Sequence, residues 1–157
     1  MATLYFVCGG PGPGKDIVDE VFGRNFESVG TAKGLFSRCN AGDGAIGFID
    51  VDDYWIFSGD ADEVFRYHDS LATMLSKAGE ALALFGQTTA GYYEVIRYKE
   101  GVEIERTLDR YTDAGDRARF KRKNLKMDDL WEAADRLLPE PTEAVFDRPV
   151  HWIKVGD

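Results

Sequence analysis

The pattern of hydrophobic and polar positions along the chain predicts strands separated by helices. Residues 3–8, TLYFVC, are aromatic, β-branched or apolar almost without interruption, which is typical of a buried strand. Apolar side chains then recur at helical spacing from Ile17 to Phe22, and predict a short helix that ends at Gly23. Residues 24–44, rich in Gly, Ser and Asn, show no clear period.

Residues 45–60, AIGFIDVDDYWIFSGD, predict two strands joined by a turn. Asp52 and Asp53 favour a reversal of the chain between two short, aromatic-rich apolar runs. A helix is expected next, because Asp60 and Glu63 have the spacing of a capping box. The predicted apolar stripe of this helix is Val64, His68, Leu71 and Leu75.

After Gly79 the hydrophobic period changes to that of strands, and an antiparallel meander is expected. Its last turn contains Gly101, which can take a positive φ angle. A final amphipathic helix is predicted from about Asp128 to Leu138, and a terminal strand over residues 150–155. The three strands of the meander are predicted at residues 80–87, 91–99 and 102–108.

Short turns join most neighbouring strands, so we expect an α+β fold with a mainly antiparallel sheet and about three helices packed on it. The 157 residues, of which 44% are hydrophobic, suffice for one sizeable core, so residues 1–157 are expected to form a single domain. No apolar run reaches the roughly 18 residues that span a bilayer, and the first residues lack the features of a secretion signal. A cytoplasmic protein with no membrane partner is therefore expected.

The formal net charge of −9 argues against general binding to nucleic acids or anionic membranes, which the chain would repel, and favours a basic partner. The charge is uneven along the sequence. Residues 43–69 contain eight acidic residues and one basic residue, whereas residues 117–126 contain six basic residues and no acidic one. Because Phe120 is the single aromatic side chain in the basic run, we interpret that run as a solvated surface, not a nucleic-acid site.

Residues 8–16, CGGPGPGKD, match the spacing of a phosphate-binding loop through Gly9, Gly14 and Lys15. Two prolines in this stretch remove backbone N–H groups that would hold a phosphate. Asp16 also stands where a Ser or Thr hydroxyl would bind magnesium. We interpret the stretch as a strand-to-helix turn, with Asp16 at the positive end of the helix dipole, and expect no cofactor.

Asp50 and Asp52, two positions apart after an apolar strand, resemble the aspartate pair of haloacid-dehalogenase-type phosphatases and of metal-dependent glycosyltransferases. Such a pair can share a magnesium ion. Tyr54, however, stands where the phosphatase pattern has a small hydroxyl residue, so an acidic turn exposed to water is favoured. A small magnesium-dependent, phosphate-handling enzyme using Asp50 and Asp52 stays open as an alternative.

The histidines and cysteines do not form a recognisable metal-ligand pattern. His68 lies on the apolar stripe of its predicted helix, and His151 lies in the terminal strand. Cys8, at the end of a strand, and Cys39, in a polar loop context, are interpreted as free thiols.

Residues 75–108 resemble a recurring core of small bacterial α+β proteins, including immunity proteins of toxin systems. A helix ends in a small-residue turn, and a strand, a polar loop, an aromatic strand and a strand carrying Gly101 and Arg106 follow. The resemblance implies a non-catalytic protein-binding module that inhibits its partner.

An acidic surface would speed the association of such a module with a basic partner. We hypothesise that four aspartates supply this surface and that two aromatic residues anchor it. A component of a larger assembly is a further alternative. The hypothesised binding residues are Asp50, Asp52, Asp53, Tyr54, Trp55 and Asp62.

Overall fold

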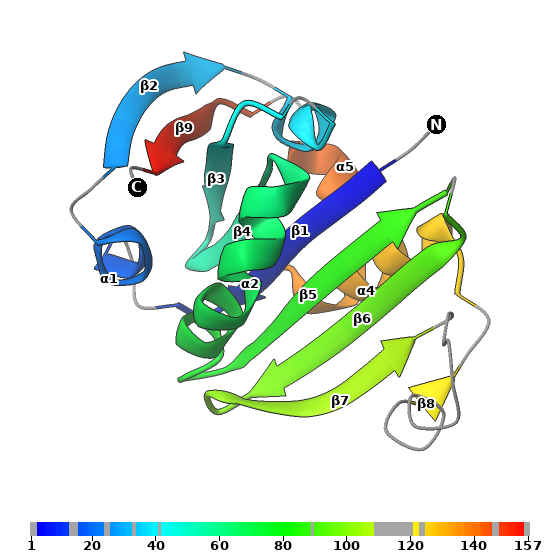
Figure 1. Cartoon of the computed structure of the whole chain (residues 1–157). Helices are drawn as coiled ribbons and strands as arrows, with labels where there is room; N and C mark the ends of the chain where they lie inside the picture. Colours follow the sequence, from blue (N-terminus) through cyan, green and yellow to red (C-terminus); the bar gives the residue numbers. More distant parts are fainter. Residues whose placement is uncertain are drawn as a thin grey trace.

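Nine strands in the described part of the chain form one sheet (Figure 1). The computed structural model describes residues 3–12, 16–23, 26–32, 34–40, 42–88, 90–108, 121–122, 125–145 and 148–155. Across the sheet the strands are β2 (Phe26–Ala32), β9 (Val150–Val155), β3 (Ala45–Val51), β4 (Tyr54–Gly59), β1 (Thr3–Gly10), β5 (Glu80–Gln87), β6 (Tyr92–Lys99), β7 (Val102–Leu108) and β8 (Lys121–Arg122). The helices are α1 (Asp16–Phe22), α2 (Ala61–Leu75), α4 (Met127–Leu137) and α5 (Thr142–Val145), with a 3-10 turn at Leu35–Arg38.

Strand β1 lies in the middle of the sheet, between β4 and β5, and is antiparallel to both. Strands β4 and β5 therefore run in the same direction, and parallel strands need a crossover connection. Helix α2 makes this crossover and lies over β1 in Figure 1. Every other described pairing is antiparallel except the short contact of β7 with β8, so the mainly antiparallel α+β fold is confirmed.

Helices cover both faces of the sheet. Side chains of β1 alternate between two cores: Phe6 and Cys8 face one, and Val7 faces the other. Helices α4 and α5 and the 3-10 turn close the first core, which we call the α4 face, while α1 and α2 close the second, the α2 face. Because both faces are covered, the central strands are buried on both sides.

Two hairpins have the tight turns that the sequence predicts. Asp52 and Asp53, with φ angles of 50° and 70°, join β3 to β4. Glu100 and Gly101, with φ angles of 53° and 83°, join β6 to β7. Two-residue loops with positive φ at both positions are type I′ turns, whose twist matches that of the flanking strands.

The structure adds details that the sequence did not predict. Strand β2 was not predicted, and Cys39, predicted in a polar loop context, lies in a turn with its side chain buried. Most of the basic run at residues 117–126 lies outside the described residues. Within the described part of the chain, no helix combines the length and the apolar character needed to cross a membrane.

Candidate functional site

The turn between β3 and β4 presents three carboxylates to solvent. Asp50, Asp52 and Asp53 are all exposed, as predicted. The backbone N–H of Asp53 donates to Oδ1 of Asp50 at 3.3 Å, which ties the turn together. No ion pair formed among the described residues involves these three aspartates. Among the described residues, the turn is therefore a compact group of carboxylates that no cation pairs with.

The two aromatic residues that follow this turn have different environments. The ring of Tyr54 is partly buried and packs against the core of the α4 face. Trp55 is only 3% exposed and lies in the opposite core, where it contacts Phe57 and Phe48. Trp55 was predicted to be an aromatic anchor of the binding surface, but its side chain is buried and does not reach the surface.

Asp62 lies at the other end of β4 from the acidic turn. The strand separates the two places by about 17 Å, at roughly 3.4 Å per residue over Tyr54–Gly59. Asp62 is exposed in the first turn of α2, where the side chain of Asp60 caps the helix by accepting from the N–H groups of Asp62 and Glu63. The structure thus divides the predicted acidic surface into two groups, and joins only Asp50, Asp52 and Asp53.

The glycine-rich stretch at the end of β1 packs against the acidic turn. The N–H of Gly12 donates to the carbonyl of Asp53 at 2.8 Å. A Cβ atom on Gly10 would lie 2.7 Å from the same carbonyl, and one on Gly9 would lie 2.6 Å from Cβ of Ala81. Close packing of β1 thus requires these glycines. Residues 13–15, which include Lys15 of the motif, lie outside the described residues.

A cavity of about 310 Å³ lies between α4 and strands β5, β6 and β7 on the α4 face. Its lining combines apolar side chains with charged ones from the sheet and from α4. The apolar lining includes Leu82, Val95, Leu125, Ala133 and Leu137. The charged lining consists of Glu80, Arg97, Glu105, Asp129, Glu132 and Arg136.

The cavity lies close to the acidic turn. Glu80 pairs with Gly10 in the ladder between β5 and β1, and Gly10 packs on its other side against Tyr54. Glu80 and Tyr54 therefore stand on either side of one strand, about 10 Å apart at the usual strand spacing. The sequence alone does not bring these two places together, because residues 54 and 80 belong to different predicted elements.

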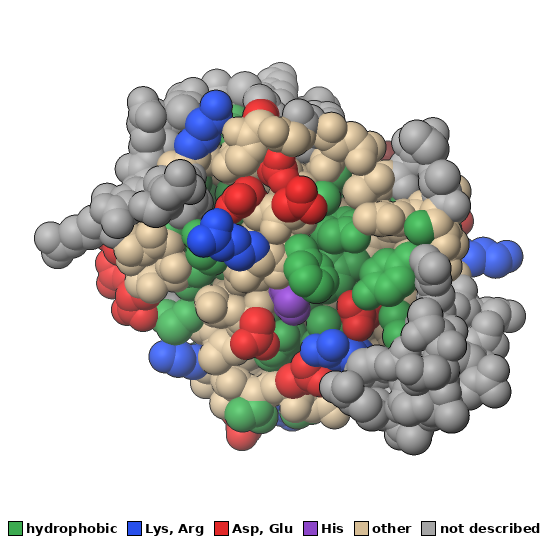
Figure 2. All heavy atoms as spheres, in the orientation of Figure 1, with side chains coloured by type: hydrophobic (Ala, Val, Ile, Leu, Met, Phe, Trp, Pro, Cys, Tyr) green, Lys and Arg blue, Asp and Glu red, His purple; other side chains and the backbone are tan. Residues whose placement is uncertain are grey.

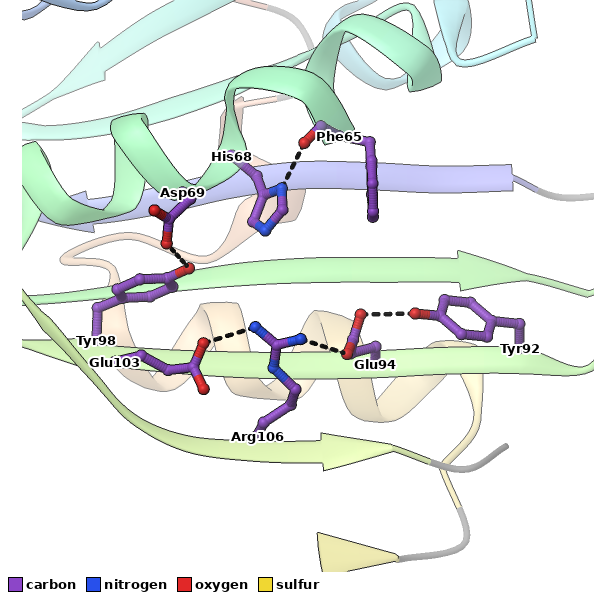
Figure 3. Close-up of polar contacts among 8 residues, drawn as sticks. All are labelled: Phe65, His68, Asp69, Tyr92, Glu94, Tyr98, Glu103 and Arg106. Carbon is purple, nitrogen blue, oxygen red and sulfur yellow. Dashed lines mark hydrogen bonds and ion pairs between the residues drawn. The ribbon is translucent and has the colours of Figure 1, made fainter. Parts of the chain in front are cut away.

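A chain of polar contacts lies on the α2 face, where β6 and β7 extend beyond the helix (Figure 3). The hydroxyl of Tyr92 donates to Oε1 of Glu94 at 2.6 Å. The guanidinium of Arg106 lies 3.7 Å from Oε2 of Glu94 and 2.6 Å from Oε1 of Glu103. Glu94 is only 5% exposed, so these contacts hold a nearly buried carboxylate. Burial raises the pKa of Tyr92, and the bond to Glu94 raises it further.

Aromatic side chains gather beside this polar chain. Phe65 is 51% exposed, and its ring lies 5.1 Å from that of His68 and 5.5 Å from that of Phe85. Figure 2 shows hydrophobic side chains clustered beside a histidine in the middle of this face. His68 is partly buried, and its Nδ1 bonds the carbonyl of Phe65, in agreement with the predicted core-edge position. The sequence analysis missed this chain of polar contacts. Its signal was available, because Tyr92, Glu94 and Tyr98 are separated by even numbers of residues along β6 and so point to the same face of the sheet.

The remaining candidates form no recognised site. His151 is exposed and stacks on Phe48, and Cys8 is buried as a free thiol. Among the described residues, no three His, Cys, Asp or Glu side chains are grouped so as to hold a metal ion. Comparison with family models, with curated proteins and with solved structures found no match to this chain.

Proposed function

We propose that the chain is a non-catalytic protein-binding module for a basic partner, and that the turn at residues 50–53 is central to its binding surface. The observation that carries the proposal is the group of exposed aspartates in this turn, for which no described residue supplies a cation. Concentrated charge of one sign steers a partner of opposite charge and raises its rate of association.

The rigidity of the turn supports this proposal. The type I′ conformation, the bond from Asp53 to Asp50 and the bond from Gly12 to Asp53 fix the backbone before any partner arrives. A surface that is already ordered loses little conformational entropy on binding. Tyr54, partly exposed beside the carboxylates, adds an aromatic ring with a hydroxyl group, the kind of side chain that is enriched in binding hot spots.

The kind of partner follows from the resemblance of residues 75–108 to immunity-type proteins. An inhibitor of this type covers the functional surface of a toxin, and a basic nuclease-like surface would match the acidic turn. In this proposal the inhibitor acts by occupation of the partner's surface, without chemistry of its own.

The proposal is tested by comparing capture of the same partner by three forms of the protein. In the turn variant, Asp50, Asp52 and Asp53 are all replaced by Asn, which tolerates the positive φ angles of the turn. In the control variant, Asp19→Asn, Glu20→Gln and Glu143→Gln remove the same charge from exposed positions elsewhere. We expect a partner that wild type and control retain at low salt, and that the turn variant loses.

Equal retention by all three forms would refute the placement of the surface. The same proteins address the enzyme alternative, because a magnesium site on Asp50 and Asp52 would give saturable Mg²⁺ binding in wild type that the turn variant, which includes Asp50→Asn, loses. Salt dependence supplies an independent reading, since an electrostatic interface weakens as ionic strength rises.

A further inference from the structure

We propose that the side of α2 that carries Asp62, Phe65 and Asp69 is a docking surface for an arginine side chain of the basic partner. The guanidinium stacks on the ring of Phe65 and pairs with one of the two carboxylates. The basic character of the occupant rests on the proposed function, whereas the surface itself rests on exposure, ring contacts and charge. Asp62 lies at the other end of β4 from the acidic turn, so this surface is a second contact and not part of the turn.

Phe65 presents an aromatic ring to solvent. Three large hydrophobic side chains are exposed in the described part of the chain, and Phe65, at 51%, is the aromatic one. Its ring centroid lies 5.5 Å from that of the fully buried Phe85 and 5.1 Å from that of His68. The ring is thus held in place by packing and still half exposed, and a cation can be attracted to it.

Carboxylates flank this ring along the helix. Asp62 is three residues before Phe65 and Asp69 is four residues after it, spacings that bring Cβ atoms on a helix within about 5–6 Å. Figure 3 shows Phe65, His68 and Asp69 projecting from the same side of α2. Asp62 and Asp69 are both exposed, and no ion pair of the described residues involves either. Oδ1 of Asp69 accepts the phenol of Tyr98, and the second oxygen can accept a further bond.

Two cations beside this side of α2 are already engaged elsewhere. The guanidinium of Arg66 lies 5.3 Å from the ring centre of Tyr67, which packs against α1. On the sheet, Arg106 is bound by the carboxylates of Glu94 and Glu103. Neither cation pairs with the two aspartates that flank the exposed ring.

The combination of an exposed ring and nearby carboxylates favours arginine over lysine. The guanidinium group is planar, stacks on aromatic rings and can donate two parallel hydrogen bonds to one carboxylate. The ammonium group of lysine is a strongly hydrated point charge that does neither as well. The surface should therefore distinguish two ligands of equal charge.

The test uses N-acetyl-arginine amide as the probe and N-acetyl-lysine amide as the control ligand. Binding is followed by the NMR shifts of backbone amides during titration of the whole protein. We expect the arginine probe to shift residues 61–70 and to bind about two- to fivefold more tightly than the lysine probe, the range of an exposed contact between a cation and a ring.

Two variants separate the ring from the charge. Phe65→Leu removes the ring but keeps an apolar side chain, and leucine is a good helix former. Asp62→Asn with Asp69→Asn removes both carboxylates, and the matched control, Glu20→Gln with Glu143→Gln, removes the same charge from exposed positions elsewhere. We expect Phe65→Leu to abolish the preference for arginine, and the double Asn variant to weaken both probes about threefold. The control should bind like wild type.

Capture of the partner supplies the second measurement. Phe65→Leu should weaken the affinity of the partner about tenfold if the ring is a hot spot of the interface. Unchanged affinity, together with arginine binding at α2, overturns the assignment to the partner. Self-association of the wild type that Phe65→Leu abolishes would assign the surface to a second copy of this chain and overturn the proposal as well.

The outcomes distinguish this surface from the acidic turn. Shifts that map elsewhere, or a preference for arginine that survives in Phe65→Leu, overturn the α2 surface and leave the acidic-turn proposal standing if the turn variant still loses its partner. A turn variant that keeps its partner while Phe65→Leu loses it supports the α2 surface and refutes the central role of the turn.

Discussion

The phenol of Tyr98 donates a hydrogen bond to Oδ1 of Asp69 at 2.8 Å, and so joins β6 to the middle of α2 (Figure 3). Tyr98 is nearly fully buried, whereas Asp69 is exposed to solvent. The bond places the polar tip of a core residue at the edge of the helix. It also links helix α2, which connects β4 to β5, to a third strand, β6, the neighbour of β5.

We expect Tyr98→Phe to lower the free energy of unfolding by about 1 kcal/mol, because one hydrogen bond is lost and the exposed carboxylate is hydrated again. Asp69→Asn, which keeps an acceptor oxygen, should cost less. Urea unfolding of the two variants measures both values. A Tyr98→Phe protein as stable as wild type would show that the bond contributes nothing.

The tyrosines also predict a loss of stability in alkali. Burial raises the pKa of Tyr5, Tyr92 and Tyr98 above the ordinary value of 10.0. The folded protein therefore holds these protons more tightly than the unfolded chain does. The stabilisation is complete below about pH 10, and the free energy of unfolding should fall as the pH rises above that value. Ultraviolet absorbance of tyrosinate, followed together with unfolding, checks this, and Tyr92→Phe should make the fall less steep.

Arg106 and Glu94 should be strongly coupled. Arg106→Gln leaves the nearly buried Glu94 without its cation, and we expect a loss of about 2 kcal/mol, less than for a fully buried pair because Arg106 is partly exposed. Adding Glu94→Gln to this variant should restore much of the loss, since no buried charge then remains. A double-mutant cycle in urea measures the coupling, and strictly additive effects would contradict it.

Gly9 is predicted to be needed for packing. A methyl group at Gly9 would lie 2.6 Å from Cβ of Ala81 and 2.7 Å from the backbone of Glu80, neither of which can move aside easily. Gly9→Ala should therefore lower the free energy of unfolding by about 2–3 kcal/mol. The matched control is Gly86→Ala, where the nearest atom, at 3.0 Å, belongs to the flexible side chain of Met127. Similar costs at both positions would argue against a special role for Gly9.

The acidic turn should accept glycine at position 53. The φ angle of 70° at Asp53 is unfavourable for most residues, so Asp53→Gly is expected to stabilise the fold by about 0.5–1 kcal/mol. Asp53→Val should destabilise it by about 1–2 kcal/mol. Asp53→Asn separates the effect of charge from that of conformation. Thermal or urea unfolding that ranks Val above Gly would contradict the turn geometry.

The sequence predicts those parts of the fold that depend on local signals. Two hairpins depend on such local signals. Asp52 and Asp53 form the turn between β3 and β4, and the alternation of polar and apolar residues at 102–108 marks the second strand of the β6–β7 hairpin. Strand β2 depends instead on pairing with β9, near the other end of the chain, and a bulge between Ser28 and Thr31 interrupts that pairing. Its own sequence, FESVGTA, contains too few apolar residues to predict a strand.

In the candidate site, too, the features that depend on local sequence were predicted and those that depend on distant contacts were not. Exposure of Asp50, Asp52 and Asp53 follows from their position in a polar turn, and it is confirmed. Burial of Trp55 follows from helices on both faces of the sheet, which a pattern within one strand does not reveal. The cavity joins β5–β7 to α4, and its proximity to the turn depends on the insertion of β1 between β4 and β5.

That insertion, and the insertion of β9 between β2 and β3, have a consequence for biosynthesis. Strand β1 leaves the ribosome before its two neighbours, β4 and β5. Strand β2 cannot pair with β9 until residues 150–155 have been made. Contacts so distant along the chain slow folding, because long loops must close before the contacts form. The nascent chain therefore carries unpaired strands until residues 150–155 have been made, and the sheet cannot assemble hairpin by hairpin in the order of the sequence.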